Sequence, residues 1–148
     1  MNMKFILLAL SLPLGTIQAQ EAKDEIDQML TLFVKNLNDL DLRPFIENFD
    51  VEATIFYPRN SFPIERVSGK ESIKNEFRTF FDNVRGNRTE PPFLSISPMD
   101  KELKVYNNIA VVSLHFKLGE EFHRRTIILE KRNNKWLITH LHASFLTE

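Results

Sequence analysis

Lys135-Trp-Leu-Ile-Thr-His-Leu-His-Ala-Ser144 is the stretch of this sequence that indicates the fold most clearly. Successive side chains of a β-strand point to opposite faces, so an extended chain places Trp136, Ile138, His140 and His142 on one face. An apolar run with a large aromatic residue is typical of a strand inside a sheet. The same face carries two titratable imidazoles, which makes both histidines candidates for a binding site.

The residues before this stretch show the same alternation of apolar and polar side chains. It predicts strands over residues 93–97, 103–106, 109–118 and 121–131, followed by the strand over 135–144. Two-residue turns are expected between the last four of these strands, at Asn107-Asn108, Gly119-Glu120 and Asn133-Asn134. The second half of the chain is therefore predicted to be an antiparallel meander.

The first half of the chain is predicted to be mostly helical. Between residues 22 and 40, apolar residues recur at spacings of three and four, which marks an amphipathic helix. A short helix is expected over 43–49 and a longer one after Gly69, with a strand over 52–57 and its hairpin partner over 62–67 between them. Helices followed by a long meander predict an α+β domain with the helices on one side of a bent sheet.

The N-terminal residues have the composition of a targeting segment. Lys4 supplies a positive charge, an apolar run extends to Gly15, and Ala19 is a small residue suited to cleavage. The run is too short to cross a bilayer of ~30 Å. We therefore expect residues 1–19 to be a signal peptide and residues 20–148 to be one periplasmic or secreted domain, with an uncleaved anchor as the alternative.

Composition excludes several kinds of partner and stabilising bond. The chain of 148 residues has no cysteine, so no disulfide can form, and its 13 phenylalanines indicate a core rich in aromatic side chains. A formal net charge of −1 argues against a nucleic-acid surface or a polybasic membrane surface. We expect neither a nucleic-acid partner nor, after signal cleavage, a membrane partner.

Two segments are similar to segments of a known superfamily. Residues 37–54 resemble the exit of the first helix and the first strand of ketosteroid-isomerase-like proteins, and residues 136–144 resemble the last strand of the SnoaL-like branch. That branch includes the association domain of calcium/calmodulin-dependent kinase II. The mature chain is thus similar to the nuclear-transport-factor-two-like, or SnoaL-like, superfamily. The resemblance implies a cone: a curved antiparallel sheet wrapped around N-terminal helices, with a pocket open at one end.

The residues that serve these relatives are replaced in this chain. The proton-shuttling aspartate of the steroid isomerases corresponds to Tyr57, and their hydroxyl donor on the first helix corresponds to Phe33. Without that base and that oxyanion donor, steroid isomerisation is not expected. Two pocket arginines of the kinase association domain correspond to Ile127 and Ala143, so its carboxylate-binding role does not transfer.

Pairing of the meander strands through their turns predicts which side chains meet. One face is then an apolar floor with a polar corner, typical of a small-molecule pocket. The other face, with Val111, Ile128 and Leu141, suits a homodimer interface. A single β-bulge would exchange the two faces along part of a strand. The predicted pairs are Lys131 with Trp136, Leu129 with Ile138, Ile127 with His140, Arg125 with His142, Phe116 with His123 and Leu114 with Arg125.

The polar corner supplies the candidate site residues. They are expected to bind the ligand, with the alternative that the histidines only make structural hydrogen bonds. A His-x-His pair needs a third ligand to hold zinc and His123 is the sole neighbour, so no metal and no cofactor are expected. The candidates are Tyr57, His123, Arg125, His140 and His142.

The sequence favours an exported, non-catalytic domain that binds a small, largely apolar molecule in the cone pocket. One alternative is an enzyme of the isomerase, dehydratase or cyclase type, with His140 or His142 as general base and Arg125 or Tyr57 stabilising negative charge. The other is a structural module for association into dimers. The expected partners are a small-molecule ligand and a second copy of the chain.

Overall fold

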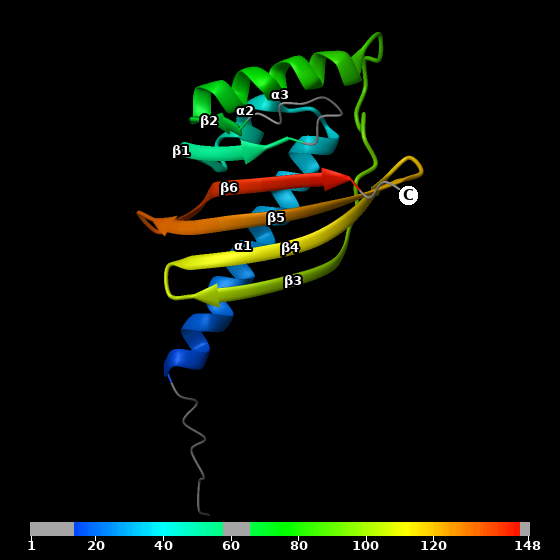
Figure 1. Ribbon diagram of the computed structural model, residues 1–148. Coiled ribbons are helices and arrows are strands. Elements are labelled where there is room, and N and C mark those ends of the chain that lie inside the picture. The colour runs from blue at the N-terminus through cyan, green and yellow to red at the C-terminus, as the bar shows by residue number, and fades with distance from the viewer. Residues whose placement is uncertain (1–13, 58–65, 146–148) are drawn as a thin grey trace, which may run out of the picture.

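The computed structural model describes residues 14–57 and 66–145 of the chain. Helices and one short hairpin come first, and four consecutive strands complete the domain, which confirms the predicted order (Figure 1). The elements are α1 (Leu14–Asn38), α2 (Leu42–Ile46), β1 (Phe49–Phe56), β2 (Arg66–Ser68), α3 (Lys70–Arg85), β3 (Pro98–Tyr106), β4 (Ile109–Leu118), β5 (Glu121–Arg132) and β6 (Lys135–Phe145).

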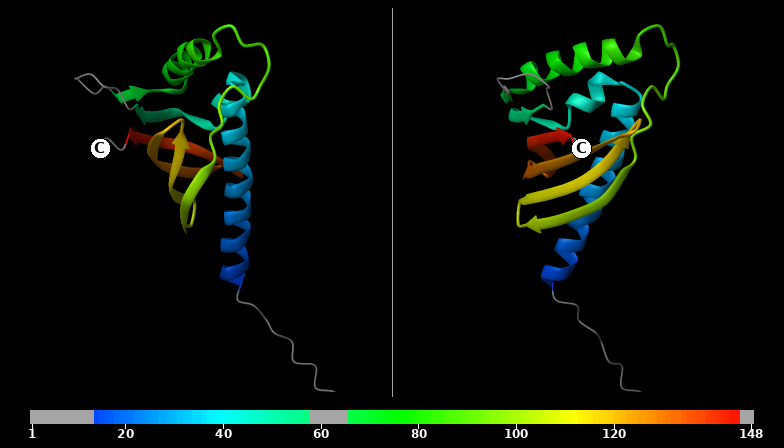
Figure 2. Two further views of the ribbon diagram at one scale, coloured as in Figure 1. Left: turned by 90° about the vertical axis from the view of Figure 1, so that its right-hand side faces the viewer. Right: turned by 45° about the vertical axis from the view of Figure 1, so that its right-hand side comes forward.

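The strands form one curved sheet in the order β2-β1-β6-β5-β4-β3. The meander from β3 to β6 is antiparallel as predicted, and β1 runs parallel to β6, so the sheet is mixed. The sheet bends around α1, while α3 lies along the edge made by β1 and β2 (Figures 1 and 2). This arrangement confirms the α+β cone with helices on the concave side.

The three two-residue turns of the meander are all present. Asn107, Asn133, Asn134 and Gly119 have φ values of 54°, 49°, 60° and 61°, in the left-handed region that these tight turns require. Asparagine and glycine adopt this region at lower cost than other residues. The turn residues therefore fix where each hairpin begins.

The predicted strand over residues 93–97 is wrong. Its apolar side chains Phe93 and Ile96 are buried, but its backbone pairs with the end of a helix instead of a strand. The N–H groups of Phe93 and Leu94 donate to the carbonyl of Asn38 at 2.8 and 3.1 Å. The side chain of Asn38 exchanges two further hydrogen bonds with the backbone of Ile96, at 2.8 and 2.9 Å. Asn38 thus provides hydrogen-bond partners for the backbone of the segment that leads into β3.

Several element boundaries differ from the prediction. Helix α1 begins before residue 22, and the short helix ends at Ile46 instead of residue 49, which belongs to β1. Residues 1–13 and 62–65, which hold most of the expected signal peptide and part of the expected hairpin partner, lie outside the described residues. The expected cleavage point after Ala19 falls within α1. None of the described helices is long and apolar enough to cross a membrane.

The core between α1, α2, α3 and β1 is built from phenylalanine rings. Phe45 is fully buried, and its ring centroid lies 4.4 Å from that of Phe77, 4.7 Å from Phe33, 5.5 Å from Phe81 and 5.6 Å from Phe49. Such stacked and edge-to-face pairs add to the burial of the rings. The aromatic core predicted from composition is present, and it forms one wall of the site described next.

Candidate functional site

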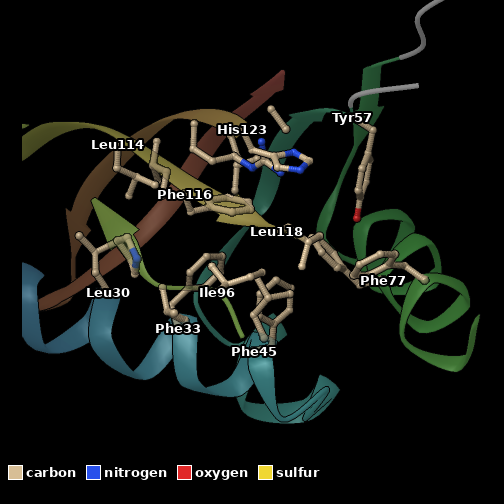
Figure 3. A pocket seen from close by; sticks show the side chains of 18 of the residues that line it. Leu30, Phe33, Phe45, Tyr57, Phe77, Ile96, Leu114, Phe116, Leu118 and His123 are labelled. Carbon is tan, nitrogen blue, oxygen red and sulfur yellow. The ribbon is translucent and has the colours of Figure 1, made fainter. Parts of the chain in front are cut away.

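A cavity of about 290 Å³ opens between the helices and the concave face of the sheet (Figure 3). Its size lies at the lower end of the range of small-molecule pockets, roughly 300–1,000 Å³. Most of its wall is apolar. The apolar side chains come from α1, α2, α3 and the strands, and include Leu30, Phe33, Val34, Leu37, Phe45, Phe77, Phe80, Ile96, Leu114, Phe116, Leu118, Ile127, Leu141 and Ala143.

Among the described residues, four polar side chains line the same cavity. Tyr57 follows β1 and points its ring toward the inside (Figure 3), while Glu121, His123 and Arg125 come from alternate positions of β5. Alternation along a strand places these three residues on one face. Glu121 was missed by the sequence prediction, although its place two residues before His123 on the strand was a signal that could have found it.

Phe116 joins two of these polar groups in one stack. Its ring lies 5.0 Å from the imidazole of His123, with an angle of 11° between the ring planes. The guanidinium carbon of Arg125 lies 4.5 Å from the centre of the same ring. The register of β4 and β5 causes this arrangement, because Phe116 pairs with His123 and Leu114 with Arg125, as predicted. The aromatic face favours a cation above it.

The imidazole of His123 is 4% exposed. Burial lowers the pKa of His123 below its usual value, and the nearby positive charge of Arg125 acts in the same direction. The carboxylate of Glu121, 3.5 Å from Nε2, opposes both effects. Because the net direction is downward, the neutral imidazole is favoured at neutral pH.

Arg125 is the one cationic side chain among the described residues that line the cavity. Burial lowers its pKa to about 10, so the guanidinium still carries its charge at neutral pH. Its Nη1 donates to the backbone carbonyls of Arg124 at 2.8 Å and Ser144 at 3.5 Å. Within residues 14–57 and 66–145, no carboxylate forms an ion pair with it.

A β-bulge in β6 overturns part of the predicted strand pairing. The pairs Lys131–Trp136 and Leu129–Ile138 are confirmed, but the register then shifts, so that Ile128 lies opposite His140. Thr139 is the extra residue, and its hydroxyl donates to the carbonyl of Ile128 at 3.3 Å. The predicted pairs of Ile127 with His140 and of Arg125 with His142 are therefore wrong. The observed partners of Ile127 and Arg125 are Leu141 and Ala143.

The bulge turns His140 and His142 to the convex face of the sheet, so neither is among the described residues that line the cavity. Nδ1 of His140 lies 2.7 Å from the hydroxyl of Thr54, and both imidazoles pack near the ring of Phe56. Burial lowers the pKa of His140, with His142 and an arginine adding to the effect. Leu141, placed on the dimer face by the prediction, instead lines the cavity.

A family model described as a SnoaL-like domain matches residues 26–148. The chain belongs to this SnoaL-like family. The match begins within α1 and includes the part of α1 that lines the cavity and every strand of the sheet. No curated protein matches this SnoaL-like domain in sequence.

Solved structures share the fold of this SnoaL-like domain. An NTF2-like protein of unknown function from Pseudomonas putida is 16% identical, with a TM-score of 0.74 over 87% of this chain and 89% of that chain. A candidate dehydratase of the NTF2-like family from Streptomyces avermitilis is 12% identical, with a TM-score of 0.72 over 88% and 99%. A candidate ketosteroid isomerase from Parabacteroides distasonis is 18% identical, with a TM-score of 0.61 over 80% and 85%.

Two positions that the sequence resemblance aligns with functional groups of the steroid isomerases face the cavity. Phe33 and Tyr57 both line it (Figure 3). At these two positions the cavity presents an aromatic ring and a phenol. Among the described residues, no three His, Asp or Glu side chains gather as a metal site would require.

Proposed function

We propose that this chain is an exported SnoaL-like domain that binds a small, largely apolar molecule in the cavity and does not catalyse a reaction. The observation that carries the proposal is the cavity of about 290 Å³, walled by apolar side chains with a few polar groups on one side. This combination is the usual character of a small-molecule site. The replacement of both isomerase positions, by Phe33 and Tyr57, supports binding over steroid isomerisation.

Filling the cavity tests this function. Ala143→Phe places a ring in the cavity, because Ala143 lines it and is 6% exposed. We expect the wild type to bind eight-carbon probes such as octanol, octanal and octanoate, and the variant to bind them about tenfold or more weakly. Isothermal titration calorimetry measures both, and circular dichroism shows whether the variant is folded.

The matched control is His142→Phe, which adds the same ring to the neighbouring position on the convex face. It should leave probe binding unchanged. Failure of the wild type to bind any of the probes, or equal binding by Ala143→Phe, would contradict the proposed function.

A second candidate function is proton transfer at a carbonyl compound. It is favoured by the buried His123, whose neutral form is a competent base, with Glu121 at 3.5 Å in the same cavity. The similar fold of the candidate dehydratase is compatible with it. An enzyme of this kind should exchange the α-protons of octanal in deuterium oxide, and His123→Gln should abolish the exchange. If the α-protons of octanal exchange no faster with the protein than without it, proton transfer is rejected and ligand binding remains the proposed function.

We also propose that the domain forms a homodimer through the convex face of the sheet. Without Leu141, the apolar residues of this face include Ile109, Val111, Ile128, Phe56 and Phe122. Multi-angle light scattering at micromolar concentration should give twice the monomer mass. A monomer mass would reject the dimer.

Export is proposed from the N-terminal residues. Cleavage after Ala19 would give a product that begins at Gln20. Intact-mass analysis of the protein recovered outside the cytoplasm should find that product, and a mass that includes Met1 would contradict cleavage.

A further inference from the structure

Arg125 is a charged group in an apolar cavity, and residues 14–57 and 66–145 supply no carboxylate that pairs with it. Its hydrogen bonds go from Nη1 to two backbone carbonyls, of Arg124 and Ser144. Nε and Nη2 have no hydrogen-bond partner in the part of the chain that the structure describes. A half-buried guanidinium in this position is costly unless an anion pairs with it.

The other polar groups of the cavity do not neutralise Arg125. The carboxylate of Glu121 is directed at His123, with Oε2 3.5 Å from Nε2, and its side chain is 71% exposed. His123 favours its neutral form, and Tyr57 is a phenol. Arg125 therefore stands next to an aliphatic and aromatic wall without an ion-pair partner among the described residues.

We propose that the ligand is a monocarboxylate with an apolar tail, whose carboxylate binds the Nε–Nη2 edge of Arg125. This inference rests on the proposed function and specifies the chemical class of its ligand. The planar fork of an arginine matches the two oxygens of a carboxylate, and hydrogen bonds between such charged groups are stronger than neutral ones. The ring of Phe116, 4.5 Å from the guanidinium carbon, holds the fork from one side.

The cavity also sets the size of the tail. An apolar cavity of ~150 Å³ accepts benzene. A cavity of about 290 Å³ therefore has room for one ring with a short chain, or for a medium-length alkyl chain. Leu30 and Phe33 of α1 line the wall that faces His123 across the cavity (Figure 3), and the tail would extend from Arg125 toward them. Octanoate is a probe of this class, and octanol is its neutral counterpart of equal length.

The test measures the affinities of octanoate and octanol for the full chain by titration calorimetry at neutral pH. The wild type should bind octanoate more tightly than octanol. Arg125→Met should weaken octanoate binding by about 10- to 100-fold, the range for a lost charge-assisted hydrogen bond, and leave octanol binding unchanged. Arg125→Lys keeps the charge but loses the fork, so its affinity for octanoate should lie between the two.

Arg124→Met is the matched control, because Arg124 precedes Arg125 on β5 and its side chain is exposed on the convex face. The hydrogen bond that Arg124 accepts from Arg125 goes to its backbone carbonyl, which the substitution keeps. It should bind octanoate like the wild type. Octanol binding by Arg125→Met shows that this variant retains its folded cavity. Equal affinities for octanoate and octanol, or octanoate binding that Arg125→Met does not change, would overturn the inference while leaving the proposed function intact. Binding of neither probe by the wild type would reject both.

Discussion

Phe45→Ala is expected to lower the free energy of unfolding by about 3–5 kcal/mol, because it removes a fully buried aromatic ring from the centre of the core. The ring contacts four other phenylalanines, with centroid distances from 4.4 to 5.6 Å, so its removal leaves a void that several rings border. A loss of this size is a large share of the ~5–15 kcal/mol that stabilises a typical domain. Urea unfolding followed by circular dichroism measures it.

Phe122→Ala provides the control for this prediction. Phe122 is 44% exposed at the start of β5, and the same truncation there should change the unfolding free energy by roughly 0.5 kcal/mol or less. Equal losses at the two positions would contradict the central role of Phe45. Phe45 also lines the cavity, so a folded Phe45→Ala variant should accept bulkier probes than the wild type.

Trp136→Ala is expected to cost a similar ~3–5 kcal/mol, and the loss should appear as instability of the whole domain instead of a selective loss of ligand binding. The indole is 4% exposed and is not among the described residues that line the cavity. Its N–H donates to Oε2 of Glu25 on α1 at 2.9 Å, and Nζ of Lys131 donates to the same oxygen at 2.6 Å. These two bonds tie α1 to β5 and β6.

Trp136→Phe separates packing from hydrogen bonding at this position. It keeps an aromatic ring but removes the N–H, so it should cost roughly 1 kcal/mol beyond the change in buried area. Thermal unfolding of both variants and of the wild type compares the two losses. If Trp136→Ala melts at the wild-type temperature, the indole does not stabilise the fold.

The sequence predicted the meander well because its turns are local signals. Asparagine pairs and one glycine specify tight turns, and each turn then fixes the register of the strands that it joins. This explains why the pairing of Phe116 with His123 and of Lys131 with Trp136 was correct. The parallel contact of β1 with β6 has no such turn, since the two strands are far apart in the chain, and the alternation within each strand does not reveal its neighbour.

The predicted positions of the candidate residues agree with the structure only up to the bulge at Thr139. Tyr57, His123 and Arg125 line the cavity, whereas His140 and His142 are not among its lining residues. That the three lining residues bind a ligand stays a prediction. A bulge is defined by the hydrogen-bond pairing between two neighbouring strands. The sequence of one strand does not contain that information, so the extra residue at Thr139 could not be recognised. The strand predicted over residues 93–97 was wrong for a related reason. Its apolar residues are spaced as in a strand, but its backbone hydrogen bonds go to the end of a helix.

The bulge at Thr139 also decides which residues of β6 belong to each side of the sheet. Beyond it, residues 140 and 142 belong to the outer surface, and residues 141 and 143 belong to the cavity wall. A change of outer-surface chemistry at the histidines therefore leaves the shape of the cavity as it is, and a change at Leu141 or Ala143 leaves the outer surface as it is. During evolution, substitutions on the outer face of β6 can therefore create a binding surface for another protein while the ligand site on its inner face is kept.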